Sequence, residues 1–396
     1  MNREEVRDSI LNISTSHKNI LIELPTGYGK TKQALDIVKK HIKLGEKILI
    51  VIPRIVLINS WKEEIKKWKL EKYLSYVTFT TYVSLPKHAD KWELIIFDEC
   101  HHLSERCRES LTSFTINRSI LLSATVKLSI KDELREVFDN LYCYKISMRE
   151  AIDNEVLPDP TIYLLPLTLN NSIQTETIVK NPKGHTPAII TDWNNRWSYI
   201  KQKDRKVLIK CTERQYYSDL DSQIEWFKNK YMRSNNDIFR NKWLRLAGER
   251  LKWLSNSKNK TVYNILKKLD KERTLTFCNS IEQTELLGSY CINSKNKNSL
   301  NILDKFNSGK INHITACNML NEGMNLVNCR IGIYANLNSS ETIVKQRLGR
   351  LLRHKNPIVI IPYFIDTREE ELVNKMLEDY NEDLIKIITD INEIKL

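Results

Sequence analysis

The chain has 396 residues, of which 41% are hydrophobic and 28% charged, as in a folded soluble protein with room for two compact domains. Its eight cysteines contain no C-x-x-C pair, which argues against a disulfide framework and a cysteine metal site. No apolar run approaches about 18 residues and the N-terminus MNREEVRDS has no signal-peptide form, so the sequence predicts a cytoplasmic protein without a membrane partner. The net charge of +13 predicts a polyanionic partner.

The stretch LPTGYGKT, residues 24–31, is typical of a phosphate-binding loop. It follows an apolar run and precedes apolar residues at helical spacing, which predicts strand, loop and helix in that order. Leu24 stands where the pattern G-x-x-x-x-G-K-[ST] has its first glycine. Backbone N–H groups of such a loop converge on an anion, while Lys30 neutralises phosphate oxygens and Thr31 reaches Mg²⁺. The alternative is a glycine-rich turn that binds nothing.

Apolar runs alternate with helical segments after this loop, which predicts an α/β domain with a parallel sheet covered on both faces. The expected strands are KILIVIP, YVTFTTY, ELIIFDE and SILLSAT. One helix between them is expected to bury a face formed by Ile58, Trp61, Ile65 and Trp68. The prolines of LPDP favour an extended connection, so the first domain is predicted at residues 1–157.

A second α/β series predicts a second domain at residues 158–396. Its segments are RTLTFCNS, INHITACN, IGIYAN, the helix SETIVKQRLGRLLR and the strand IVIIPYFI. Before this series we expect a hairpin around KNPKG and a helical region at roughly 212–269. These two features predict a mainly helical insertion or subdomain at about 170–269.

The stretch LIIFDECHH places two carboxylates at the carboxyl end of an apolar strand, where ligands bind in α/β sheets. Asp98 would hold Mg²⁺ through water, and Glu99 would orient or deprotonate the attacking water. One alternative is a pair of solvated acidic residues. Another is a zinc cluster formed by Cys100, His101, His102 and Cys107, although three adjacent side chains converge poorly on one metal.

Two later stretches carry weaker signals. In SETIVKQRLGRLLR, helical spacing places Gln346, Arg350 and Arg353 on one face, where guanidinium groups can reach phosphate across a domain cleft. Such an arginine finger contributes roughly 10³ to 10⁵ in rate. The alternative is a basic amphipathic helix with a solvated face. SILLSAT by itself is equally compatible with an ordinary strand end.

The positive charge is concentrated in the middle of the chain. Residues 192–273 hold 21 Lys and Arg against 10 Asp and Glu, and five of the eight tryptophans. Aromatic and basic side chains together can stack bases and neutralise phosphates. The favoured interpretation makes these tryptophans core residues, because Trp243, Ala247, Leu251 and Leu254 form a helical apolar stripe. The basic face could still contact DNA.

In order, the motifs resemble those of superfamily 2 helicases and translocases, from about residue 19 to residue 366. They are LPTGYGKT, VIPRIVLINSW, FTTYVSL, FDECHH, LLSAT, TFCNS, ACNMLNEGMNL and QRLGRLLR. Members of that superfamily keep T-G-x-G-K-T without the first glycine. The resemblance implies two RecA-like domains with ATP between them and nucleic acid across their tops.

The resemblance also implies roles for individual residues. Those that bind triphosphate would be Thr26, Gly27, Tyr28, Gly29, Lys30, Thr31 and Gly323, with Mg²⁺ at Thr31 and Asp98. Hydrolysis would use Lys30, Asp98, Glu99, Gln346, Arg350 and Arg353. Nucleotide state would be coupled to strand engagement by His101, Ser123 and Thr125. Contacts to the phosphodiester backbone would come from Arg54, Thr80 or Thr81, and Asn279 or Ser280.

Three departures from the family pattern qualify this transfer. No glutamine precedes residue 33, so a glutamine contact to adenine is absent. Asn325 stands where many relatives have Asp, and DECH in place of DEAD favours DNA translocases, including phage-encoded members, over RNA-specific proteins. We therefore predict an ATP- and Mg²⁺-dependent motor on DNA. The alternatives are an RNA helicase, a nucleotide-gated clamp without turnover, and a nucleotide-binding protein unrelated to nucleic acid.

Overall fold

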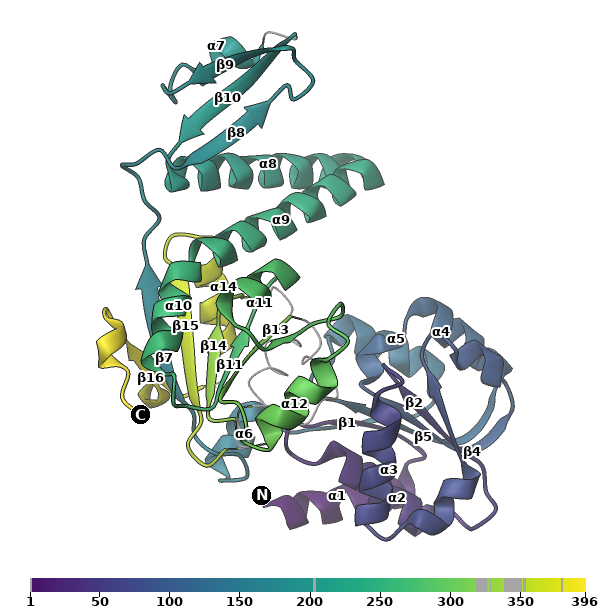
Figure 1. Cartoon of the computed structure of the whole chain (residues 1–396). Coiled ribbons are helices and arrows are strands. Elements are labelled where there is room, and N and C mark those ends of the chain that lie inside the picture. Colours follow the sequence, from purple (N-terminus) through teal and green to yellow (C-terminus); the bar gives the residue numbers. More distant parts are fainter. Residues whose placement is uncertain are drawn as a thin grey trace.

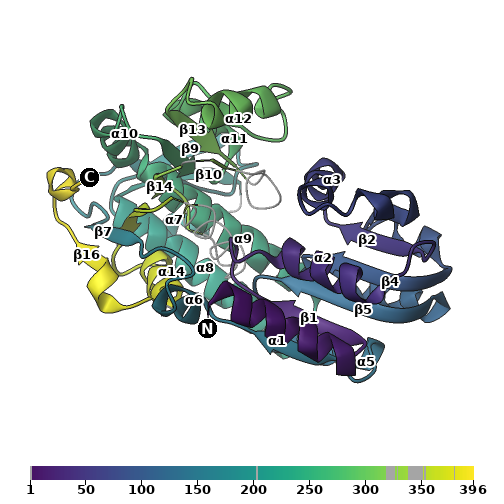
Figure 2. The ribbon, with the colours of Figure 1, turned by 90° about the horizontal axis from the view of Figure 1, so that it is seen from below.

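Two parallel β-sheets with helices on both faces form the two main bodies of the chain, and both views place these bodies side by side (Figures 1 and 2). The computed structural model describes residues 2–201, 204–317, 326–327, 329–337, 351, 354–378 and 380–396. Among these residues no helix is long and apolar enough to cross a membrane. The fold is α/β with two RecA-like domains, as the sequence predicts.

The first domain is built on a six-stranded sheet with the order β3-β2-β4-β5-β1-β6, in which every pairing is parallel. Its strands are β1 Asn19–Glu23, β2 Ile48–Ile52, β3 Val77–Thr81, β4 Lys91–Asp98, β5 Thr115–Ser123 and β6 Tyr142–Lys145. Its helices are α1 Arg3–Ser16, α2 Lys30–His41, α3 Leu57–Lys67, α4 Glu105–Ser110, α5 Leu128–Val137 and α6 Met148–Asp153. Apolar side chains alternate between two buried clusters: α1, α2 and α3 cover one face, and α4 and α5 cover the other.

The second domain contains a seven-stranded parallel sheet with the order β12-β13-β11-β14-β15-β7-β16. Its strands are β7 Thr161–Leu167, β11 Thr274–Phe277, β12 Cys291–Ile292, β13 His313–Ala316, β14 Ile331–Tyr334, β15 Ile358–Phe364 and β16 Ile385–Ile387. Its helices are α10 Asn259–Lys268, α11 Ile281–Leu287, α12 Ser299–Asn307 and α14 Arg368–Leu377. The short 3-10 helices of the two domains are Glu71–Tyr76, Leu85–His88, Cys100–His102, Leu111–Ser113, Glu382–Leu384 and Ile391–Glu393.

Between β7 and β11 the chain forms an arm that projects from the second domain (Figure 1). Its elements are β8 Glu176–Lys180, β9 Thr186–Ile190, α7 Arg196–Ile200, β10 Arg205–Cys211, α8 Glu213–Ser234 and α9 Asp237–Ser257. The two long helices form an antiparallel hairpin joined at Asn235 and Asn236. The predicted helical region is thus present, but the three-stranded sheet was not predicted.

The predicted hairpin around KNPKG is wrong. Strands β8 and β9 do not pair with each other, because both pair with β10, β8 in the antiparallel and β9 in the parallel direction. The loop between them lies directly against the start of β10: a Cβ atom on Gly184 would lie 2.2 Å from the backbone nitrogen of Lys206. A third strand from later in the chain therefore replaces the local pairing that the turn residues favour.

The predicted apolar face of the helix at Trp61 is correct except at its end. Trp61 and Ile65 are buried in the first domain, whereas Trp68 is 39% exposed. Helix α3 ends at Lys67, so Trp68 leaves the helical stripe and lies on the surface. There its indole donates to Glu64, and the Lys32 ammonium lies 3.9 Å from its ring centroid.

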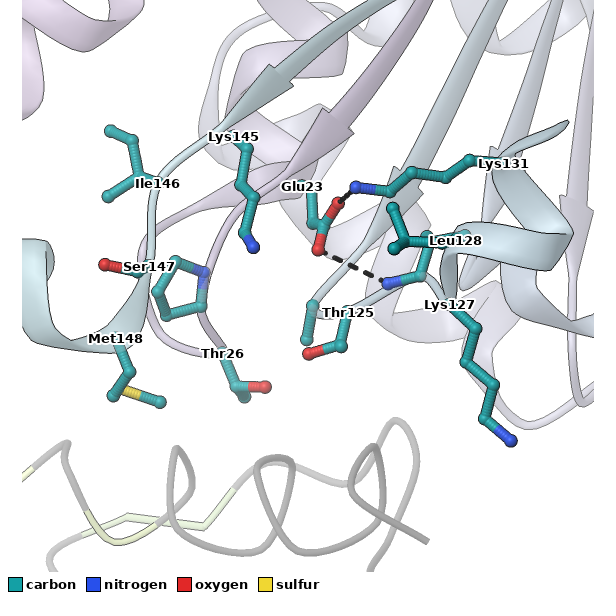
Figure 3. A pocket seen from close by; sticks show the side chains of 13 residues that line it. Glu23, Thr26, Thr125, Lys127, Leu128, Lys131, Lys145, Ile146, Ser147 and Met148 are labelled. Carbon is teal, nitrogen blue, oxygen red and sulfur yellow. Dashed lines mark hydrogen bonds and ion pairs between the residues drawn. The ribbon is translucent and has the colours of Figure 1, made fainter. Parts of the chain in front are cut away.

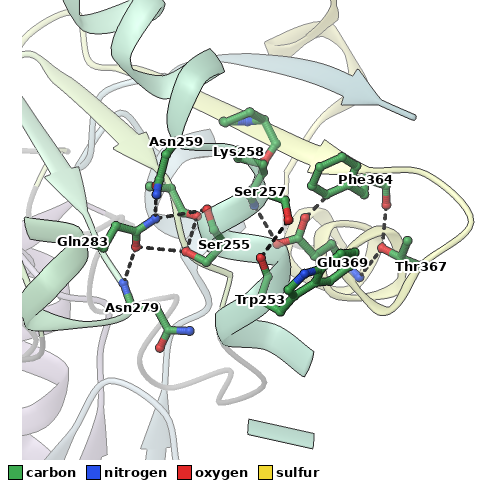
Figure 4. Close-up of polar contacts among 12 residues, drawn as sticks. Trp253, Ser255, Ser257, Lys258, Asn259, Asn279, Gln283, Phe364, Thr367 and Glu369 are labelled. Atoms are coloured by element: carbon green, nitrogen blue, oxygen red, sulfur yellow. Dashed lines mark hydrogen bonds and ion pairs between the residues drawn. The ribbon is translucent and has the colours of Figure 1, made fainter. Parts of the chain in front are cut away.

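A buried ion pair joins the arm to the second sheet (Figure 4). Lys258, between α9 and α10, lies 2.6 Å from a Glu369 carboxylate oxygen, and the two side chains are 0% and 1% exposed. Lys258 also donates to the Pro362 carbonyl, and the Phe364 backbone N–H donates to Glu369. Burial lowers the pKa of Lys258, while Glu369 opposes that shift. The pair is therefore viable only with both partners present.

We predict that Lys258→Met lowers the free energy of unfolding by about 3–5 kcal/mol, because it leaves a buried carboxylate without its cation. Urea unfolding followed by circular dichroism measures this loss. The double variant Lys258→Met/Glu369→Leu should lose less than Lys258→Met alone. In the exposed pair Lys228–Glu225, Lys228→Ala should cost under about 1 kcal/mol. An equal loss at both lysines would contradict the prediction.

Candidate nucleotide site

The carboxyl ends of the first sheet's strands bring the predicted site residues to one edge. The phosphate-binding loop follows β1, Asp98 ends β4, and Ser123 ends β5. The Leu24 backbone N–H donates to the Ser123 carbonyl at 3.1 Å, so the loop continues the pairing of β1 with β5. Parallel strands share this edge, which is where ligands bind in open α/β sheets.

The loop at residues 24–31 has the backbone geometry of an anion cradle. Gly27 and Gly29 have φ values of 92° and 104°, a region that favours glycine, and Gly29 immediately precedes α2. Tyr28 is 3% exposed and its side chain packs in the apolar core, which anchors the loop to the domain. The Lys30 ammonium donates to the Leu24 carbonyl at 3.2 Å, across the inside of the loop. This geometry fits a phosphate group at the N-terminus of a twelve-residue helix.

Asp98 is held by two aromatic residues that sequence reasoning did not assign to the site. The Trp61 indole donates to its carboxylate at 2.9 Å, and the Tyr82 hydroxyl donates to its backbone carbonyl at 2.6 Å. Burial and the neighbouring Glu99 carboxylate raise the pKa of Asp98 to about 6, against the opposing effects of Trp61 and Lys30. A cation in addition to Lys30 would stabilise the ionised Asp98 carboxylate. The carboxylate oxygens at this edge therefore fit a hard cation such as Mg²⁺.

Glu99 and His101 form a contact with the end of β5. Glu99 has a left-handed backbone with φ 52°, and its Oε2 is buried without a hydrogen-bond partner in the part of the chain that the structure describes. His101 Nδ1 lies 3.5 Å from that oxygen and 3.1 Å from Ser123 Oγ. The Ser123 hydroxyl also donates to the Thr125 carbonyl at 3.0 Å. The chain Glu99, His101, Ser123, Thr125 therefore links β4 to β5.

The zinc alternative does not fit the geometry. Cys107 donates to the Tyr82 carbonyl, Cys100 lies in an apolar cluster, and His101 faces Ser123. Among the described residues, no group of three or more His, Cys, Asp or Glu side chains is placed to hold a metal.

A cavity of about 430 Å³ lies beside the phosphate-binding loop (Figure 3). Its walls include Thr26 and Thr125, together with three lysines and the carboxylate of Glu23. Glu23 lies 2.5 Å from Lys131 and accepts from the Val126 backbone N–H. Neither Lys30 nor Asp98 lines this cavity. It is therefore a cationic space adjacent to the expected phosphate position and distinct from it.

The residues predicted to contact a nucleic-acid backbone differ in their accessibility. Arg54 is exposed after β2, and Thr81 is half-buried at the end of β3. Thr80 is 6% exposed and faces the interior, so Thr81 is the better placed of the two threonines. In the second domain, Ser280 accepts from the Gln283 backbone N–H at the start of α11, and the Asn279 backbone N–H donates to the Gln283 side chain. Their predicted role stays a prediction.

Some predicted site residues lie outside the described residues. They are Gly323, Gln346, Arg350 and Arg353, and Asn325 lies there too. The remaining members of the predicted nucleotide site come together at one edge of the first sheet.

Sequence reasoning missed four residues at this edge: Trp61, Tyr82, Glu23 and Lys131. Trp61 was assigned to a buried helix face, which is correct, but its indole N–H also reaches Asp98. A buried indole or phenol group usually has a hydrogen-bond partner. This rule could have predicted that Trp61 and Tyr82 bond to a polar group nearby. Nothing in the sequence pairs Glu23 with Lys131, because the two residues meet only through the packing of α5 against β1.

Two family models match the chain. The model for the type III restriction enzyme res subunit matches residues 1–128, and the helicase conserved C-terminal domain matches residues 257–355. With the paired parallel sheets and the phosphate-binding loop, they define a P-loop NTPase with two RecA-like domains. The two matched domain models and the similarity to a DNA translocase indicate a superfamily 2 helicase or translocase.

Similar proteins are found among archaeal and viral sequences. The DNA 3'-5' translocase XPB2 of Sulfurisphaera tokodaii is 26% identical over 387 residues, covering 92% of this chain and 79% of that protein. The putative helicase 161L of Invertebrate iridescent virus 6 is 28% identical over 147 residues, which is 31% of this chain and 33% of that one.

Solved structures with the same fold include two of low sequence identity. S. cerevisiae Dbp5 bound to RNA and ADP BeF3 has a TM-score of 0.59 at 11% identity, covering 97% of this chain and 89% of that one. A fragment of a putative HsdR subunit of a type I restriction enzyme from Vibrio vulnificus YJ016 has a TM-score of 0.56 at 16% identity, covering 97% and 67%. At such identities the likeness concerns the fold.

We predict that Asp98→Asn stabilises the nucleotide-free protein at pH 7. The pKa of Asp98 is raised from 3.8 to about 6, so ionisation there costs folding free energy, in full above pH 6 and not at all well below 3.8. Removing the charge should raise the free energy of unfolding by about 1–3 kcal/mol, measured by thermal unfolding. Asp90→Asn is the matched control, because Lys47 lowers the pKa of that exposed carboxyl. Destabilisation by Asp98→Asn would contradict the assignment.

Proposed function

We propose that this chain is an ATP- and Mg²⁺-dependent motor that moves along DNA. The observation that carries the proposal is the meeting of Lys30, Asp98 and Glu99 at one sheet edge, beside a loop whose backbone is shaped for phosphate. A protein that only binds nucleotide has no need of a carboxylate such as Glu99, whose buried Oε2 has no hydrogen-bond partner among the described residues and lies 3.5 Å from His101 Nδ1.

In the proposed reaction, Lys30 and the N–H groups at the start of α2 hold the β and γ phosphates of ATP. Glu99 orients the attacking water and accepts its proton as the water oxygen bonds to the γ phosphorus and the bond to ADP breaks. Thr31 and Asp98 would hold Mg²⁺, which would neutralise the phosphate oxygens when bound. Arg350 and Arg353 are proposed, from the sequence, to close on the γ phosphate from the second domain.

Two observations favour DNA as the nucleic acid along which the motor moves. The similar protein of Sulfurisphaera tokodaii is named a DNA translocase, and the second motif reads DECH. The proposed contacts are Arg54 and Thr81 on the first domain and Asn279 and Ser280 on the second, so alternating grip would require motion between the domains. We propose the domain boundary at residues 157 and 158, before β7 enters the second sheet.

We predict that DNA stimulates ATP hydrolysis, and that Lys30→Ala and Glu99→Gln each lower the steady-state rate at least about 100-fold. Lys30→Ala removes the charge on the phosphates, and Glu99→Gln removes the base. The measurement is phosphate release by the purified chain alone and with single-stranded, duplex or branched DNA, or RNA. Lys39→Ala, at an exposed position of the same helix, should hydrolyse ATP at the wild-type rate.

Two results would redirect the proposal. Binding of nucleotide and DNA without turnover under any condition would leave the clamp as the function. Turnover that ignores both DNA and RNA would point to a nucleotide-binding protein unrelated to nucleic acid.

We propose that Ser123 transmits nucleotide state, because it joins His101 to Thr125. Ser123→Ala should leave ATP hydrolysis within about threefold of wild type while strand displacement per ATP falls about tenfold, since the hydroxyl has no role in chemistry. Strand displacement and phosphate release measured in one reaction give the ratio. Ser119→Ala, at a buried serine of the same strand, should leave this ratio unchanged. Parallel loss of both activities would instead place Ser123 in the hydrolytic site.

A further inference from the structure

The arm's helical hairpin is buried at one end and open at the other. Near its base, Tyr217, Leu220, Ile224, Leu246 and Leu254 are buried. From residue 225 to residue 245, around the turn between α8 and α9, no residue is buried. Figure 1 shows this distal end projecting beyond the second domain. We name residues 226–245 the tip.

The tip combines exposed apolar side chains with positive charge. It contains six Lys and Arg and one Asp. Four large apolar side chains are more than half exposed: Trp226 at 52%, Met232 at 72%, Ile238 at 73% and Leu244 at 51%. Exposed apolar side chains do not stabilise the folded monomer, and patches of them often mark binding surfaces. The tip therefore resembles an interaction site.

The aromatic residues of the tip gather around Trp226 without covering it. The Trp226 ring meets Phe227 edge-on at 4.7 Å between centroids, and Phe239 lies 6.3 Å from it. These edge contacts hold the indole while more than half of the side chain stays in water. The Lys230 ammonium lies 5.5 Å from the Trp226 ring centroid, so a cation and an aromatic face are presented together.

Only some of the basic side chains of the tip form ion pairs within the chain. Lys228, Arg240 and Arg245 pair with acidic residues on their own helices. For Lys230, Arg233 and Lys242, no acidic side chain lies within ion-pair distance in the described parts of the chain. Lys230 lies beside the exposed indole, Lys242 lies 5.9 Å from the Phe227 ring centroid, and Arg233 follows Lys230 on the same helix. Cations and an exposed indole match the two needs of single-stranded nucleic acid, phosphate neutralisation and base stacking.

The base of the hairpin is fastened to the second domain next to a proposed strand contact (Figure 4). The Ser255 hydroxyl on α9 lies within hydrogen-bond distance of the Gln283 side-chain oxygen and the Ala335 carbonyl, and Gln283 accepts from the Asn279 backbone N–H. The buried pair of Lys258 and Glu369 lies one turn further along. The tip is therefore carried by the second domain and would move with it.

We propose that the tip is a second nucleic-acid contact, which binds the unpaired strand by stacking a base on Trp226 and holding phosphates with Lys230, Arg233 and Lys242. Single-stranded nucleic acid is favoured over duplex because only an unpaired base offers its face to an indole. The inference rests on the proposed function for its substrate class. It adds a site outside the cleft, on an element that the motor would displace.

The test compares variants of the full-length chain without nucleotide, by fluorescence anisotropy of labelled oligothymidine and of a duplex. Trp226→Ala should raise the Kd for oligothymidine about tenfold and change that for duplex less than about twofold. The triple variant Lys230→Ala/Arg233→Ala/Lys242→Ala should reduce the slope of log affinity against log salt by about 2. Trp197→Ala is the matched control, because Trp197 on α7 is 54% exposed in the same basic segment and should bind like wild type.

Basal ATP hydrolysis without nucleic acid separates this proposal from the proposed function. Trp226→Ala should keep the basal rate, and circular dichroism should show its helices intact. Lys30→Ala should lose hydrolysis yet bind oligothymidine like wild type, so either proposal can fail alone. Equal Kd values for Trp226→Ala, Trp197→Ala and wild type would overturn the tip as a strand contact. So would a self-associated chain that Trp226→Ala converts to monomers without changing its affinity for oligothymidine.

Discussion

The site depends on one constraint, the common edge at which parallel strands end. Strands β1, β4 and β5 lie side by side, so the residues that follow them meet although they are separated by many positions in the chain. Both faces of the sheet are covered by apolar clusters, which leaves the edge as the place where polar groups can reach a ligand. Asp98, Glu99, Ser123 and the phosphate-binding loop are therefore neighbours by topology.

The same edge concentrates features that oppose folding. Asp98 is ionised in a half-buried position, Glu99 has a left-handed backbone, and the Thr26 hydroxyl is buried without a partner in the described structure. Each is unfavourable in the folded protein alone. A divalent cation would stabilise the Asp98 carboxylate, and a phosphate group would accept from the Thr26 hydroxyl, so two of these groups fit the proposed nucleotide with its metal. Trp61 and Tyr82 hold Asp98 in place meanwhile.

Buried polar contacts hold the base of the arm in one position on the second domain. The arm leaves the second domain after β7 and returns before β11. Apolar packing is not directional, so by itself it would not fix the position of α9 on the sheet. Lys258 with Glu369, and Ser255 with Gln283, set one arrangement of α9 on the sheet because each buried polar group has a single set of partners. The base is consequently fixed, while the aromatic tip remains in water.

The sequence by itself determined the local units of this protein. Apolar runs with helical segments between them predicted β1 to β5 of the first sheet and β11, β13, β14 and β15 of the second, since burial on two faces requires continuous apolar strands. Strands β6, β7, β12 and β16 were not predicted. The glycines, Lys30 and Thr31 defined the loop, because that pattern lets backbone N–H groups surround a phosphate. The order of motifs identified the superfamily without any coordinates.

Only the tertiary structure decided which distant groups meet. The pairing of β8 and β9 with β10, the indole bond from Trp61 to Asp98, and the contact of Glu23 with Lys131 join residues whose partners lie far along the chain. The sequence also did not determine which tryptophans are exposed. Trp243 and Trp253 pack against apolar clusters, whereas Trp226 and Trp197 are exposed to water. Local patterns specify the face a side chain takes on its own element, but burial depends on what packs against that face.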